Sequence, residues 1–302
     1  MNPRSFTPRL LALAIAAALM LSTGRTAEVA APVPPPVTMA RPSPAEVTKV
    51  TEDLKQFVAG ADAGTQSLVA KFPELIAVRP PRANPAIVPA LNQGFRARHD
   101  GFVAIAQKGD IDVLFMGDSI TDWWRREGAA GVANPAMSGK TVFDQNFGTM
   151  KVANFGIAGD TTQGVLYRLQ NGEGQGFQPK AIMLMIGTNN AANSSSGEIA
   201  EGVGAVVLEL RKDFPAAKIL LLGIFPRGNP GDAVRKTVAD VNPIIAKLHD
   251  GKNTFYLDIG SKFLDADGRI PREIMGDLLH PTEKGYTIWA EAIKAPLADL
   301  LK

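Results

Sequence analysis

After Gly109 the chain alternates between short, nearly continuous apolar runs and longer amphipathic stretches such as GEIAEGVGAVVLELRKDF. Strands of a parallel sheet are covered on both faces, so they are apolar throughout and do not alternate with polar residues. The pattern therefore predicts an α/β fold in three layers, with a central five-stranded parallel sheet. The five runs, each ending in Gly, Ser, Asn or Pro, are IDVLFMGDS, VANFGIAG, AIMLMIGTNN, KILLLGIFP and TFYLDIG.

The first 31 residues have the layout of a secretory signal peptide. Arg4 and Arg9 precede an apolar run of 12 residues (10–21), and small residues follow it. A helix that spans a bilayer needs about 20 apolar residues, so an uncleaved membrane anchor is the weaker interpretation. We therefore expect a periplasmic or secreted protein that has no integral membrane domain once residues 1–31 are removed.

The rest of the chain divides into three segments. Residues 32–44 (PVPPPVTMARPSP) are proline-rich, which favours an extended linker, although such a segment can also dock in an aromatic groove of a partner. Residues 45–105 contain helix-like patches interrupted by VRPPRANPAIVP, and we expect a helical N-terminal extension that packs on or wraps the main domain. Residues 106–302 carry the α/β pattern and form that main domain.

Charge and cysteine content exclude several kinds of partner and cofactor. Without residues 1–31 the chain has as many Lys and Arg as Asp and Glu residues, so no basic surplus favours nucleic acid or an anionic membrane. The chain has no cysteine and therefore no disulfide, and its three histidines are too scattered for metal-ligand spacing. We expect neither a metal nor an organic cofactor.

Of the three histidines, His280 is the candidate base. His249 ends an amphipathic stretch, where its charge suits the helix dipole, and His99 precedes the first strand; a structural role is the simpler interpretation for both. His280 follows Asp277 by three residues in GDLLHP, just before a helix that we expect to begin near Thr282. An aspartate at that spacing can hold the ring Nδ1, although a loop Asp and His before a helix cap would look the same.

Polar residues at the ends of the first three predicted strands could complete an acyl-transfer site. Ser119 follows the first strand, Gly159 the second and Asn189 the third. The carboxyl ends of parallel strands lie at one edge of the sheet, where ligands bind. A serine beside a base can act as a nucleophile, and amide donors can stabilise an oxyanion. Each residue alone is more simply a turn or cap residue, so it is their coincidence that favours a site.

Four sequence blocks, in order, resemble those of the SGNH (GDSL) hydrolase superfamily: GDSIT, NFGIAGDTTQGVLYRL, GTNN and DLLHP. The second and third are especially similar to the catalytic subunits of intracellular platelet-activating-factor acetylhydrolase. An export signal is unlike a cytosolic enzyme, however, so bacterial exported esterases that deacetylate carbohydrates are the nearer functional comparison. The resemblance covers residues 111–302 and does not extend to residues 32–104.

The resemblance implies a flavodoxin-like three-layer fold and a serine esterase that needs no cofactor. It implies that Ser119 is the nucleophile, that His280 is the base and that Asp277 orients it. The oxyanion hole would consist of the Ser119 and Gly159 backbone amides and the Asn189 side chain. The expected substrate is a short-chain ester, mainly an acetyl ester, of a small molecule or carbohydrate.

Two alternatives remain open on the sequence. A lysophospholipase or arylesterase would use the same triad and differ in its acyl pocket, which Trp123 and Trp124 could line if they are not core residues. A non-catalytic carbohydrate-binding module on the same fold is disfavoured, because every position of the triad and of the oxyanion hole is filled.

The signal layout makes a testable prediction about the mature chain. We predict that protein recovered outside the cytoplasm lacks about the first 24 to 31 residues, because a signal peptidase cleaves after the small residues that follow the apolar run. N-terminal sequencing of the exported protein checks this. An exported chain that begins at Met1 or Asn2 would contradict it.

Overall fold

The computed structural model describes residues 29–78, 82–126 and 137–302, so the predicted signal peptide lies almost wholly outside the described residues. The strands are β1 (Val113–Gly117), β2 (Val152–Asn154), β3 (Ala181–Met185), β4 (Lys218–Leu222) and β5 (Thr254–Leu257). The helices are α1 (Pro44–Ala59), α2 (Ala63–Lys71), α3 (Arg96–Ala106), α4 (Ser119–Asp122), α5 (Lys140–Phe147), α6 (Thr162–Arg168), α7 (Ser196–Asp213), α8 (Ala233–Ile245) and α9 (Glu283–Leu300). Among the described residues, no helix has both the length and the hydropathy that crossing a membrane requires.

The five strands form one parallel sheet in the order β2-β1-β3-β4-β5. The predicted α/β fold with a five-stranded parallel sheet is therefore confirmed. The strand β1 lies between β2 and β3, and Gly117 at its end is aligned with Met185 at the end of β3. The turns that follow β1, β2 and β3 consequently start at neighbouring points on one edge of the sheet.

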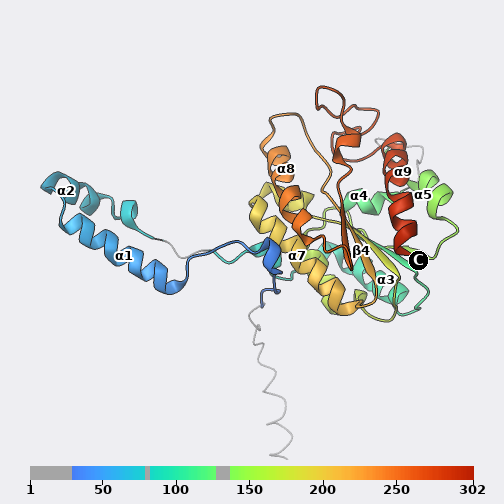
Figure 1. Cartoon of the computed structure of the whole chain (residues 1–302), viewed down its shortest axis with the longest axis horizontal. Helices are drawn as coiled ribbons and strands as arrows, with labels where there is room; N and C mark the ends of the chain where they lie inside the picture. Colours follow the sequence, from blue (N-terminus) through green and yellow to red (C-terminus); the bar gives the residue numbers. More distant parts are fainter. Residues whose placement is uncertain (1–28, 79–81, 127–136) are drawn as a thin grey trace, which may run out of the picture.

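Helices cover both faces of the sheet, because alternate residues of each buried strand point to opposite sides. Leu114 and Ile182 belong to a core shared with α3, α6, α7 and α8, whereas Phe115 and Met183 belong to a core shared with α5 and α9. Figure 1 shows α7 and α8 on one side of β4 and α5 and α9 on the other. Both faces are apolar, which explains why the strands have no polar alternation.

The proline-rich stretch is not only a linker, because part of it packs against the domain. Val37 in the short 3₁₀ helix η1 (Pro35–Val37) is buried in the core shared with α7. Gly204 of α7 leaves the space for it, since a Cβ there would lie 2.6 Å from Val37 Cγ2. Arg41 then donates two hydrogen bonds to the buried Glu201 carboxylate of α7.

The region predicted as a helical extension has two different parts. Helices α1 and α2 pack against each other without burying any residue, and Figure 1 shows them apart from the sheet. Helix α3 instead belongs to the core, where Phe102 stacks on Phe155 with ring centroids 4.7 Å apart. The predicted boundaries at residues 44 and 105 therefore do not coincide with the points where burial changes.

This difference predicts contrasting effects of two phenylalanine substitutions. Phe102→Ala should lower the free energy of unfolding by about 3 kcal/mol or more, because the ring is 3% exposed and its removal leaves a cavity. Phe57→Ala on α1, where the ring is 73% exposed, should change it by less than about 0.5 kcal/mol. Urea unfolding of both variants checks this, and similar losses in the two would contradict it.

Candidate active site

Ser119 lies where β1 ends and α4 begins. The Asp118 carboxylate caps this helix by accepting the Ile120 N–H at 3.0 Å, which leaves Ser119 as the first helical residue. Its side chain is at the carboxyl edge of the sheet but only 5% of the residue is exposed. The Tyr286 hydroxyl of α9 donates to the Ile120 carbonyl at 2.8 Å and so joins the helix that carries Ser119 to the helix that follows His280.

The structure brings the three predicted triad residues into one hydrogen-bonded chain. His280 Nε2 lies 2.9 Å from Ser119 Oγ, and His280 Nδ1 lies 2.6 Å from Asp277 Oδ2. A carboxylate only accepts hydrogen bonds, so Nδ1 carries the ring proton and Nε2 can accept the proton of the serine hydroxyl. This is the arrangement by which a histidine activates a serine nucleophile.

A strained turn holds Asp277 and His280. Leu278 between them has a φ of 62°, a conformation that a branched residue adopts rarely. Asp277 Oδ1 accepts the backbone N–H groups of Leu279 and His280, at 3.0 and 2.7 Å. Partial burial would raise the pKa of the Asp277 carboxyl, but the hydrogen bonds from His280 outweigh it and lower the pKa below its usual value. The carboxylate is therefore ionised when it orients the ring.

The predicted oxyanion donors lie on the next two strand-end turns. Gly159 has a φ of 85°, which favours glycine there, and Asn189 lies in the 3₁₀ helix η7 (Thr188–Ala192). Neither the Ser119 nor the Gly159 backbone N–H donates to another residue in the described part of the chain. One N–H of the Asn189 side chain donates to the Asp160 carbonyl at 2.8 Å, and the other remains for a ligand.

The two neighbouring tryptophans have different surroundings. The Trp123 ring stacks on His280, with ring centroids 3.9 Å apart, and the Arg126 guanidinium lies over the same ring. Trp124 is fully buried against Tyr286 and Trp289. Of the two residues that we considered for an acyl pocket, Trp124 is thus a core residue, whereas Trp123 contacts the candidate base.

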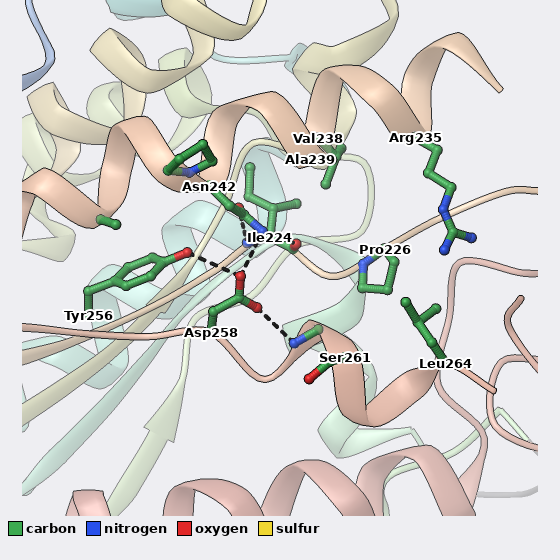
Figure 2. Close-up of a pocket in the computed structure, with 13 residues that line it drawn as sticks. Ile224, Pro226, Arg235, Val238, Ala239, Asn242, Tyr256, Asp258, Ser261 and Leu264 are labelled. Atoms are coloured by element: carbon green, nitrogen blue, oxygen red, sulfur yellow. Dashed lines mark hydrogen bonds between the residues drawn. The ribbon is translucent and has the colours of Figure 1, made fainter. Parts of the chain in front are cut away.

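Two cavities lie near the carboxyl edge of the sheet. One of about 350 Å³ adjoins Gly159 and is lined by residues that precede α3, including Leu91 and Phe95. Another of about 440 Å³ lies beside β4 and β5 (Figure 2). No triad residue lines either cavity, but the first is lined by a predicted oxyanion donor and the second is not. In that second cavity the Asp258 carboxylate already accepts hydrogen bonds from protein groups, among them the Gly260 N–H at 2.8 Å. The first cavity is therefore the better candidate for a substrate pocket.

Comparison with known proteins identifies the family. The sequence profile of the GDSL-like lipase/acylhydrolase family matches residues 115–288, which include all five predicted site residues. The chain belongs to this family. Within the described residues of this GDSL-like acylhydrolase, no three His, Asp or Glu side chains come together in a way that could hold a metal ion.

Curated relatives of this GDSL-like acylhydrolase include two platelet-activating factor acetylhydrolase IB subunits from Rattus norvegicus. Subunit alpha2 is 34% identical over 72% of this chain and 91% of its own length, and subunit alpha1 is 32% identical over 67% and 82%. The fold is similar to that of a GDSL-like lipase from Bacteroides thetaiotaomicron, with a TM-score of 0.52 and 19% identity over 68% of this chain and 97% of that one. The family and the esterase class of the enzyme agree with the resemblance seen in the sequence.

Several polar residues around the site were missed by the sequence analysis. Asp122 accepts the Ala158 N–H at 3.0 Å and pairs with Arg98, so it braces the turn that carries Gly159. His99, for which we expected a structural role, is buried and bonded to Glu173 in an ion-pair network behind the same turn. In the sequence nothing distinguishes Asp122 and Arg98 from charged residues of a solvent-exposed surface. His249 lies away from the site and accepts the Tyr256 N–H.

Asp118, next to Ser119, makes a prediction about pH and stability. Burial raises the pKa of this carboxyl to about 7. The Ile120 N–H and the charge of Arg227 oppose this rise, whereas the charge of Asp160 adds to it. The unfolded chain releases this proton near the ordinary value of 3.8, so between 3.8 and about 7 the folded protein binds more protons. The carboxyl therefore makes stability fall as pH rises through this window.

Asp118→Asn should remove that part of the pH dependence while keeping a side-chain cap on α4. We expect the wild type to lose stability relative to the variant as the pH rises from about 4 to about 7, and the difference to stay constant above that. Urea unfolding at a series of pH values measures it. Parallel stability curves for the two proteins would show that Asp118 does not titrate in this range.

Proposed function

We propose that the protein is an exported serine esterase that removes a short acyl group, most suitably acetyl, through an acyl-enzyme on Ser119. The observation that carries the proposal is the continuous hydrogen-bonded chain from Ser119 Oγ through His280 to Asp277. Family membership supports the esterase class, and the acetyl group is supported by the names of the platelet-activating factor acetylhydrolase relatives.

In the proposed reaction, Ser119 Oγ attacks the ester carbonyl while its proton moves to His280 Nε2. The carbonyl oxygen becomes an oxyanion, which the Ser119 and Gly159 N–H groups and the Asn189 side chain stabilise. As the C–O bond to the alcohol breaks, His280 gives its proton to the leaving oxygen. Water then gives His280 a proton and attacks the acyl-enzyme, and the carboxylic acid leaves as the proton returns to Ser119.

The cavity beside Gly159 supports a small substrate with polar groups. Its volume of about 350 Å³ is at the lower end of the range for ligand pockets, and its lining combines apolar Leu91 and Phe95 with the amides Asn92 and Gln163. A short acyl chain with a polar alcohol fits such a lining better than a long alkyl chain does. The residues before α3 would then take part in specificity.

For the alcohol half we propose an acetylated carbohydrate, since the signal layout favours action in the periplasm or outside the cell, where such esters are accessible. A second candidate is an acetylated phospholipid, which the names of the curated relatives favour. The two candidates share the same chemistry at Ser119 and differ only in what the leaving alcohol contacts.

Ser119→Ala tests the nucleophile. It should lower kcat for p-nitrophenyl acetate by about 10⁴-fold or more, since the covalent route is lost. A fluorophosphonate probe should label the wild type at Ser119, as peptide mass spectrometry will show. Ser261→Ala is the matched control, because Ser261 lines the other cavity, and it should keep normal turnover and labelling. Retained turnover in Ser119→Ala would overturn the proposal.

Comparing the hydrolysis rates of different esters resolves the substrate class. We expect acetate esters to be hydrolysed faster than butyrate and octanoate esters, and acetylated xylan to release acetate faster than an acetylated lysophospholipid does. Preference for octanoate would overturn the acetyl assignment while leaving Ser119 in place. Faster release from the phospholipid would replace the carbohydrate with the second candidate.

A further inference from the structure

A buried ion-pair network lies behind the turn that carries Gly159. It consists of Asp160, Arg168, Glu173 and His99, and no side chain in it is more than 4% exposed. Arg168 donates from Nε to Asp160 Oδ2 at 2.9 Å, its Nη2 forms an ion pair with the same oxygen at 2.8 Å, and it also pairs with Glu173. His99 Nδ1 lies 2.8 Å from the other oxygen of Glu173.

Burying these charges is costly, so the network calls for a role beyond holding helices together. Removing two carboxylates and a guanidinium from water costs free energy that their attraction recovers only in part, and apolar residues of similar volume would often stabilise a fold as well or better. What charged hydrogen bonds add is direction, because a planar guanidinium that bonds two carboxylates fixes the positions of both.

Asp160 is the point where this network reaches the predicted oxyanion donors. It directly follows Gly159, and its backbone carbonyl accepts the Asn189 side-chain N–H at 2.8 Å. Gly164 of α6 leaves room for its carboxylate, since a Cβ there would overlap Oδ1. Asp160 is thus adjacent in sequence to Gly159 and bonded to the Asn189 side chain, so it is connected to both predicted donors.

We propose that Arg168, supported by Glu173 and His99, is a positioning residue for the oxyanion hole, acting through Asp160 on Gly159 and Asn189. The inference rests on the proposed function, because it assumes that these donors stabilise an oxyanion. Arg168 contacts no substrate. Its contribution is that the two donors keep their directions while charge develops on the substrate oxygen.

A double-mutant cycle with Asn189→Ala tests this role, using kcat and KM for p-nitrophenyl acetate. Asn189→Ala should lower kcat by about 10²- to 10³-fold, and Arg168→Lys by about 10- to 100-fold, with KM changed by less than about threefold. If Arg168 acts through Asn189, the double variant should lose at least about fivefold less than the product of the two single losses. Losses that simply multiply would overturn the inference.

The controls separate positioning from folding and from the proposed function. Arg211→Lys is the matched substitution, because Arg211 donates to carbonyls at the far end of α7, and it should leave kcat unchanged in both backgrounds. If circular dichroism shows that Arg168→Lys does not fold, Glu173→Gln replaces it in the same cycle, because this variant keeps the ion pair between Arg168 and Asp160. If Ser119→Ala loses all turnover but the losses from Asn189→Ala and Arg168→Lys simply multiply, the proposed function stands and only the positioning role of Arg168 is rejected.

Discussion

The close pairing of β1 and β3 at their carboxyl ends is the constraint on which the site depends. Gly117 is aligned with Met185, and a Cβ at Gly117 would overlap both the Met185 carbonyl and the side chain of Thr121. Only without that side chain can the chain turn directly from β1 into α4 while the end of β3 lies beside it. Ser119 and Asn189, which follow these two strands, therefore lie at the same edge, and the β2 turn brings Gly159 beside them.

Much of this geometry could be predicted from the sequence, for a physical reason. Strands covered on both faces must be apolar at every position, so the five strands appeared as apolar runs, and the chemical residues stood where the runs ended. The strand order followed only from the flavodoxin-like fold that the resemblance implies. The angle of each turn could not be predicted, because it depends on packing between distant elements. The buried network was also missed. A helical pattern assigns Arg168 to a solvent-exposed face, and only the folded structure shows that it is buried and paired with Asp160 and Glu173.

The packing of part of the proline-rich stretch on the domain could not be predicted from its own residues, because the information about it lies elsewhere in the chain. PVPPPV by itself favours an extended linker, because its prolines cannot donate the backbone hydrogen bonds of a helix or sheet. The surface of α7 draws this stretch onto the domain, because Gly204 has no side chain and leaves the space that Val37 fills, and because Glu201 binds Arg41. In a single helix, such a glycine looks like a weak point and not like a docking position for a segment far away in the sequence.

The two sides of Ser119 are held in different ways, and this difference bears on how such a site works. On the side of the predicted oxyanion donors lies the fully buried ion-pair network, which under our proposal keeps these donors from turning. The base side depends on a turn in which the Asp277 side chain is 41% exposed and Leu278 is strained. Strain of this kind persists only when the surroundings fix it, and here the Gly228 N–H binds the Leu278 carbonyl at 2.8 Å while Trp123 stacks on His280. Both sides of the candidate site are therefore held in place, the predicted oxyanion donors beside buried charge and the candidate base by a braced turn and a stacked ring.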